Sequence, residues 1–174
     1  TGDRELHISS DVAYAVWQYW RVTGDEGFMI RYGAEMLLDT AVFWGCRAEW
    51  DANAEHYAFT EVIGPDEYHE HVDNNFFTNY LVQWHLQRAL DILEWLCHHE
   101  PTKAAELTER LALSAEVLDH WRHIIARLYI GHGPDGKVFE QFAGYFTRRD
   151  VDLAALEPRD HSVQTILGIK ATNE

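Results

Sequence analysis

The stretch Val62-Ile63-Gly64-Pro65-Asp66-Glu67-Tyr68-His69-Glu70-His71-Val72-Asp73-Asn74-Asn75 joins a β-branched extended segment to a long aromatic helix. Carboxylates, histidines and a tyrosine surround its Gly-Pro turn. A turn between rigid elements is where a scaffold presents catalytic groups to a ligand. A carboxyl held there against aromatic side chains can have its pKa raised, which makes it a general acid at neutral pH. The stretch is therefore a candidate acid-catalysis site.

Upstream of this stretch, the periodicity of apolar residues predicts two helices. Ser9-Ser10-Asp11 offers an N-cap for a helix over residues 12–22, which Gly24 ends. That helix is apolar on nearly all sides, so we expect it to be buried on more than one side. Asp25 is expected to cap a second helix that runs to about Trp50.

The rest of the chain predicts one extended piece and further helices. Residues 56–63 alternate in polarity and carry β-branched side chains, which favours a short strand or extended loop. Helices are expected over residues 75–97, from Pro101, from Ser114, and for one turn near residues 163–167, with a Gly-Pro turn at residues 133–137. Long antiparallel helices with functional loops at one end are typical of an all-α barrel or toroid.

Composition excludes several classes of function. A length of 174 residues fits one domain, and a formal charge of −15 argues against nucleic acid and anionic membranes as partners. No run of 18 apolar residues is present, so no membrane span is expected. Cys46 and Cys97 are predicted to be buried free thiols, which fits a reducing cytoplasm. No signal peptide is evident, and because the chain lacks an initiating Met, we expect its true start to lie elsewhere.

The chain also resembles a known family. Residues 64–75 followed by Phe77-Thr78-Asn79 are similar to the catalytic signature of the disaccharide phosphorylases of glycoside hydrolase family 65. Further resemblance lies, in the same order along the chain, in residues 7–20, 23–25, 43–47 and 139–146. The resemblance implies that residues 1–174 are a partial catalytic domain. Its expected fold is all-α, part of an (α/α)6 barrel with a short β-hairpin and extended loops at one end.

The resemblance implies that Glu67 is the general acid. A glycosidic oxygen is a poor leaving group until a carboxylic acid protonates it. An inverting hydrolase needs a second carboxylate to activate water, whereas a phosphorylase uses inorganic phosphate as its nucleophile. We therefore expect phosphate as co-substrate and no metal or organic cofactor. The alternative is that Glu67 is only a turn carboxylate near the N-terminus of the following helix.

Six further residues are candidates for contact with the substrate. Asp66, Tyr68 and His69 flank the acid, where they orient it, contact the sugar, or only pack the turn. His7 precedes the first helix, and the resemblance implies a role at the acceptor-sugar site; a capping or surface histidine is the alternative. Glu140 and Gln141 either hydrogen-bond near the pocket or form a buried pair that stabilises the hairpin around them.

Two other patterns carry less weight. His69, His71 and Asp73 alternate, but zinc needs three or four convergent ligands, so no metal site is predicted. Trp17, Trp20, Trp44 and Trp84 could stack on sugars, but their helical spacing favours core positions.

Parts of the family pattern are absent. The upstream Trp and Asp that hold the glucosyl residue and the His-Ser-Ser phosphate-binding stretch are missing, and the role of the family's Lys-Gln-Ala-Asp segment is not transferred to Lys170. The leading hypothesis is an inverting phosphorylase that converts an α-linked glucose disaccharide and phosphate to β-glucose 1-phosphate and an acceptor sugar. The fragment is expected to be inactive alone, and the full-length parent is compatible with a homodimer.

Two rival functions stay open: an inverting hydrolase of the acid trehalase type, and a non-catalytic helical carbohydrate-binding module. The first-helix sequence HISSDVAYAVWQYW favours kojibiose-type over maltose-type members of a family that also includes trehalose and nigerose phosphorylases.

Overall fold

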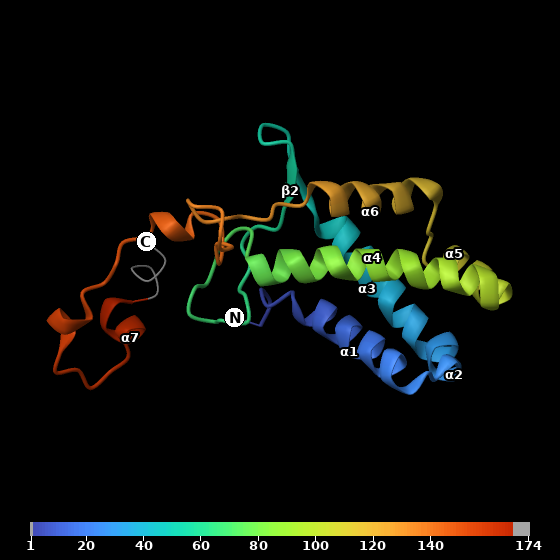
Figure 1. The fold of residues 1–174 in the computed structure, drawn as a ribbon, viewed down its shortest axis with the longest axis horizontal. Coiled ribbons are helices and arrows are strands. Elements are labelled where there is room, and N and C mark those ends of the chain that lie inside the picture. The colour runs from blue at the N-terminus through green and yellow to red at the C-terminus, as the bar shows by residue number, and fades with distance from the viewer. Residues whose placement is uncertain (1, 169–174) are drawn as a thin grey trace.

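The central element of the fold is a single long helix, α4 (Phe76–His99), around which the other helices pack. The computed structural model describes residues 2–168, which are mostly helical. In Figure 1, α4 runs between α6 (Ala115–Arg127) and α1 (Ile8–Thr23), while α3 (Ala34–Arg47) crosses behind it. The main hydrophobic core lies where α4 packs against α1, α3 and α6. α4 packs against α3, α1, α5 and α6.

The first helix begins earlier than its sequence predicts. α1 starts at Ile8 with His7 at its cap, so the predicted N-cap at Ser9-Ser10-Asp11 is wrong. Ser10 lies inside the helix and is fully buried. Its hydroxyl hydrogen-bonds to His85 on α4 and does not cap the N-terminus of α1. Gly24 ends the helix in the left-handed conformation, as predicted.

Burial of α1 is one-sided rather than general. Ala13, Val16 and Trp17 face the core, whereas Val12 is 46% and Val22 83% exposed. The prediction that this helix is buried on more than one side is wrong for residues 2–168, because α3 and α4 both pack on its inner side. Its outer apolar side has no cover among the described residues.

The second predicted helix is interrupted and shorter. Asp25 caps α2 (Glu26–Phe28) by accepting a 2.8 Å hydrogen bond from the Phe28 N–H, as predicted. A π-helical turn over Met29–Gly33 then leads into α3. The helix ends at Arg47 and not at Trp50, because Ala48 is extended and Glu49–Asp51 (β1) pairs antiparallel with His56–Ala58 (β2). The predicted extended piece is thus one arm of a short hairpin.

The third predicted helix is confirmed as one continuous element. Asn75 caps α4 by accepting a 3.1 Å hydrogen bond from the Thr78 N–H. The buried side chains of α4 recur at helical spacing from Val82 to Leu96. This long helix therefore connects the candidate site at its N-terminus to the far end of the structure.

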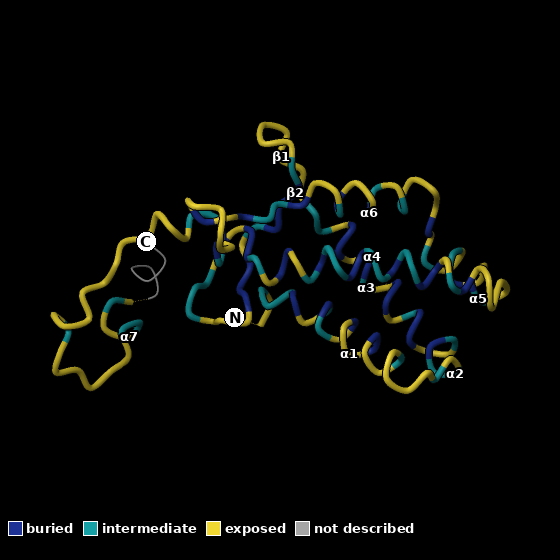
Figure 2. Tube along the Cα trace, in the orientation of Figure 1, coloured by how far each residue is buried: buried dark blue, intermediate teal, exposed yellow. Residues whose placement is uncertain are grey.

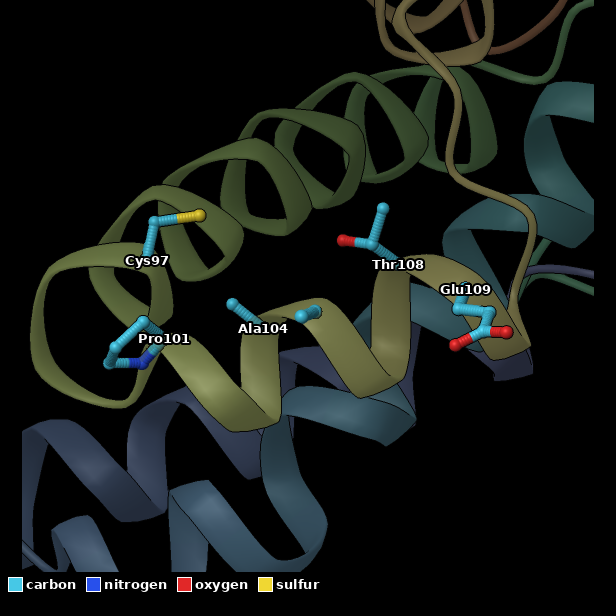
Figure 3. A pocket seen from close by; sticks show the side chains of 6 residues that line it. Cys97, Pro101, Ala104, Thr108 and Glu109 are labelled. Atoms are coloured by element: carbon cyan, nitrogen blue, oxygen red, sulfur yellow. The ribbon is translucent and has the colours of Figure 1, made fainter.

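At that far end, α5 (Pro101–Arg110) folds back on α4, and Ser114 caps α6 as predicted. A groove of about 450 Å³ lies between α4 and α5 (Figure 3). Cys97 lines this groove and is exposed, and Cys46 on α3 is exposed as well. The predicted burial of both thiols is wrong, because they lie on outward helix faces; neither forms a disulfide, as predicted.

Beyond the helices, residues 129–142 form a short hairpin-like turn, and the chain then extends away from the helices to α7 (Val163–Leu167) (Figure 1). Figure 2 shows that this last segment is largely exposed. The short helix predicted near residues 163–167 is confirmed, while Lys170 lies outside the described residues. Within residues 2–168, no helix is both long and apolar enough to cross a membrane.

Candidate active site

The Glu67 loop, defined as residues 63–71, is closed at its base by a β-bridge. The Val62 N–H donates to the Val72 carbonyl at 2.9 Å, and the Val72 N–H donates back at 3.0 Å. Both valines are buried, so the bridge is anchored in the core. Glu67 lies midway between them and is exposed. The aromatic enclosure expected around its carboxyl is therefore not supplied by residues 2–168.

Asp66 shapes the turn on which Glu67 lies. One of its carboxylate oxygens, Oδ1, accepts a 3.1 Å hydrogen bond from the Tyr68 N–H, which forms an Asx turn around Glu67. The other, Oδ2, accepts a 2.8 Å hydrogen bond from the Gln141 side-chain amide. Two candidates far apart in the sequence are thus brought together beside Glu67.

The side chain of His69, within the loop, packs in an aromatic cluster. Its ring centroid is 4.9 Å from that of the buried Phe142, 5.4 Å from that of Tyr68 and 6.4 Å from that of Tyr145. Its Nδ1 is buried and has no hydrogen-bond partner among the described residues. The imidazole is therefore placed by ring packing.

His71 faces a different partner. Its Nδ1 lies 2.8 Å from Glu61 Oε2, and the Arg4 guanidinium approaches the same carboxylate at 2.8 Å. The hydrogen bond from His71, more than the charge of Arg4, lowers the pKa of Glu61. Because His69 packs among aromatic rings and His71 pairs with Glu61, the alternating histidines do not converge on one point.

The base of the loop holds three non-glycine residues with positive φ: Glu61 (55°), His71 (58°) and Asn74 (55°). Each such residue costs on the order of 1 kcal/mol and persists only where its surroundings fix it. Asn74 is fixed by its Oδ1, which accepts from the Phe59 N–H at 3.2 Å and from Asn79 Nδ2 at 3.1 Å. The loop base is thus held in a strained shape by the core beneath it.

Gly64 allows the loop to approach the start of α4. A Cβ at this position would lie 2.3 Å from Asn75 Nδ2, so only glycine leaves room for the buried asparagine that caps α4. The cap and the first residues of the loop are therefore packed as one unit.

Glu140 points into the hairpin that precedes Gln141. It is buried and accepts a hydrogen bond from the Tyr129 hydroxyl. Burial, followed by the hydrogen bond and the charge of Glu140, raises the pKa of Tyr129 to about 12. Glu140 is thus paired with Tyr129 inside the hairpin, whereas Gln141 bonds to Asp66 and does not form a pair with Glu140.

His7 is also buried and lies at the start of α1. Its Nδ1 is 2.8 Å from Asp11 Oδ2, and its ring makes an edge contact with Phe77 at 5.7 Å. The adjoining segment touches the loop, because the Ile63 N–H donates to the Arg4 carbonyl at 3.1 Å. His7 thus lies where α1 and α4 meet, with its ring turned to Phe77.

Sequence reasoning missed part of this site. Arg4, Glu61 and Asn74 hold the loop base, and Phe142 and Tyr145 pack against His69. The Asp-Asn-Asn run before α4 is a turn signal that could have pointed to Asn74. The others depend on contacts between distant segments, for which a single sequence carries no local signal.

Comparisons with known proteins place this geometry in context. The family model described as the glycosyl hydrolase family 65 central catalytic domain matches residues 1–173. A kojibiose phosphorylase of Caldanaerobacter subterraneus subsp. tengcongensis is 43% identical over 150 residues, which cover 86% of this chain and 20% of the relative. A 1,2-alpha-glucosylglycerol phosphorylase of Bacillus selenitireducens is 42% identical over 144 residues, covering 83% of this chain and 18% of the relative.

A third relative, a nigerose phosphorylase of Lachnoclostridium phytofermentans, is 35% identical over 161 residues, covering 90% of this chain and 21% of the relative. A solved structure assigned as a kojibiose phosphorylase, from the human microbiome, matches with a TM-score of 0.82 at 23% identity. The match covers 95% of this chain and 24% of that one, and it shows the shared fold. The chain spans about a fifth of the length of the curated relatives it matches.

Proposed function

Since the chain belongs to glycosyl hydrolase family 65, whose central catalytic domain it matches over residues 1–173, we propose that it carries the general acid of a disaccharide phosphorylase. The reaction is the attack of inorganic phosphate on an α-linked glucose disaccharide, which gives β-glucose 1-phosphate and the acceptor sugar. The observation that carries the proposal is the placement of Glu67 at the exposed apex of a loop fixed at both ends.

In the proposed mechanism, the protonated carboxyl of Glu67 donates its proton to the glycosidic oxygen as the bond from that oxygen to the anomeric carbon breaks. A phosphate oxygen attacks the anomeric carbon from the opposite face, so the configuration inverts. The acceptor sugar leaves as a neutral alcohol, and Glu67 is left as a carboxylate. Phosphate replaces the water that a hydrolase must activate, so no second catalytic carboxylate is needed.

The (α/α)6 barrel is part of the same proposal. Within residues 2–168, α6 runs antiparallel to α4 and α1 runs parallel to it, with the Glu67 loop at the end where α4 begins (Figure 1). The exposed outer side of α1 is the kind of surface that further helices of a barrel would cover. The remaining helices, with the groups that hold glucose and phosphate, would come from the rest of the parent chain.

For the substrate, we favour kojibiose. The first-helix sequence supports this choice, as do relatives named as kojibiose phosphorylases at 41–43% identity. Other relatives are named for nigerose and 1,2-alpha-glucosylglycerol. The disaccharide and phosphate are the proposed partners; the homodimer and the cytoplasmic location stay predictions.

The test is turnover by the full-length parent protein with kojibiose, nigerose, maltose and trehalose, each with and without inorganic phosphate. We expect phosphate-dependent formation of the β anomer of glucose 1-phosphate, fastest with kojibiose. Release of glucose at the same rate without phosphate would favour the hydrolase of the acid trehalase type. Binding of a disaccharide with no turnover of any of the four would favour a non-catalytic carbohydrate-binding module.

A further inference from the structure

We propose that the hydrogen bond between Gln141 and Asp66 positions Glu67 for proton transfer, so that Gln141 acts through the loop and not on the sugar. This inference rests on the proposed role of Glu67 as general acid. It changes the expectation for both residues, which the sequence marks as candidates for substrate contact. Gln141 is then a positioning residue.

The segment that carries Gln141 is itself fixed to the base of the Glu67 loop and to α4. The Gln141 carbonyl accepts a 2.9 Å hydrogen bond from the Phe76 N–H at the start of α4. The Ala143 N–H donates to the Asp73 carbonyl at 3.0 Å. Between these two bonds, the side chain of Phe142 is buried against His69. Residues 141–143 therefore form a rigid platform beside the loop.

From this platform, the Gln141 amide reaches the one acidic side chain that defines the turn around Glu67. Asp66 uses Oδ1 for the Tyr68 N–H and Oδ2 for Gln141, so its carboxylate has one hydrogen bond on each oxygen. An Asx turn alone orders the loop locally but does not fix it relative to α4. The bond to Gln141 supplies that second constraint.

The position of Glu67 decides how well it can act. A general acid must lie within hydrogen-bond reach of the atom that it protonates, and a displacement of about 1 Å can cost on the order of a hundredfold in rate. Because Glu67 directly follows Asp66 in the chain, a shift of the Asp66 carboxylate moves the backbone that carries the acid. Loss of the Gln141 bond should therefore slow protonation without removing the acid.

The variant Gln141→Glu tests this directly, because it places a carboxylate where an amide donated to Asp66. Two carboxylates at hydrogen-bond distance repel each other, so the bond is broken while side-chain size is kept. The second change Asp66→Asn restores complementarity. In the double variant, the asparagine oxygen still accepts from the Tyr68 N–H, and the asparagine amide donates to the carboxylate introduced at position 141.

In the full-length parent, we expect Gln141→Glu to lower kcat for kojibiose phosphorolysis by about tenfold to a hundredfold. Asp66→Asn together with Gln141→Glu should recover most of that loss. With α-glucosyl fluoride, whose fluoride leaves without protonation, Gln141→Glu should retain nearly the wild-type rate with phosphate. The matched control is Gln87→Glu, which breaks a 2.9 Å amide–carboxylate bond to Asp91 on α4, away from the loop, and should leave both rates unchanged.

Three outcomes would overturn the inference. Equal loss on kojibiose and glucosyl fluoride with a raised KM would make Gln141 a sugar-binding residue. Absence of recovery in the double variant, with an unchanged melting temperature, would show that the bond to Asp66 does not act through Glu67. Wild-type kcat in Gln141→Glu would show that the bond has no role. If the wild-type parent itself turns over neither substrate with phosphate, the proposed function fails instead, which keeps the two failures distinct.

Discussion

The imidazole Nδ1 of His85 lies 3.0 Å from the hydroxyl oxygen of Ser10, inside the interface between α4 and α1. On the other side of the ring, Nε2 lies 3.0 Å from the Leu37 carbonyl and 3.1 Å from the Thr40 hydroxyl, both on α3. One fully buried side chain on α4 thus joins α4 to α1 and α3.

This arrangement predicts acid sensitivity of the fold. Burial lowers the pKa of His85 from 6.5 to about 4, so the unfolded state takes up a proton that the folded state excludes. The contribution of His85 to stability is therefore fully present above pH 6.5 and is lost as the pH falls toward 4. Between pH 8 and pH 5, we expect the titration of His85 to lower the free energy of unfolding by about 2 kcal/mol.

The measurement is the thermal melting midpoint of the full-length protein at several pH values, for the wild type and for His85→Gln. The variant keeps an amide that can donate to Leu37 but cannot titrate, so its melting midpoint should fall less between pH 8 and pH 5. His98→Gln, at the exposed end of α4, should behave as the wild type. Parallel pH profiles for wild type and His85→Gln would contradict the assignment.

Gly64→Ala should destabilise the protein by about 1–3 kcal/mol, because the added methyl group overlaps the Asn75 side chain that caps α4. The melting midpoint of the full-length parent measures the effect. Gly2→Ala is the control, since a Cβ at Gly2 meets no atom within 4 Å. A Gly64→Ala protein as stable as the control would show that the asparagine is free to move aside.

Tyr129→Phe should also lower the melting midpoint, because it leaves the buried Glu140 carboxylate without the Tyr129 hydroxyl. A charged group that loses a buried partner costs about 1–3 kcal/mol or more. The double variant Tyr129→Phe with Glu140→Leu should be less destabilised than the sum of its two single variants, since both polar partners are removed. Additive losses would mean that the pair does not interact.

The sequence predicts the helices and strands of this fold better than it predicts where each begins and ends. Gly24, Asp25, Asn75 and Ser114 act at helix ends because their local chemistry suits a cap, and the structure confirms their positions. Ser10 looks equally suitable for a cap but is used by His85, 75 residues away. Cap chemistry is local, whereas the competition for a hydroxyl is decided by tertiary packing.

In the candidate site, too, local sequence signals could be predicted and tertiary contacts could not. Residues 64–75 point to Glu67 because the whole motif, with its residue types and its family resemblance, lies in one continuous segment. The bond from Gln141 to Asp66, the packing of Phe142 on His69 and the strained φ of Glu61 all depend on segments that meet only in the folded chain. A single sequence carries no pattern for such long-range contacts, so they could be found only from the structure.

The isolated 174-residue chain should be inactive and should self-associate. Large apolar side chains on its surface, such as Val22 (83% exposed) and Tyr32 (56% exposed), lack cover among the described residues. Contiguous exposed apolar patches above a few hundred Å² promote association. Light scattering gives the mass in solution, and an assay with kojibiose and phosphate gives the activity. A monomer that turns over kojibiose would show that fewer parts of the parent are needed than proposed.

Glu67→Gln in the full-length parent removes the proposed proton donor while it keeps the shape of the side chain. The measurement is kcat for kojibiose phosphorolysis at saturating phosphate, with the melting midpoint as the check that the fold is intact. We predict a loss of about 10²–10⁴-fold with an unchanged melting midpoint. A Glu67→Gln enzyme with wild-type kcat would contradict the assignment of Glu67 as the acid.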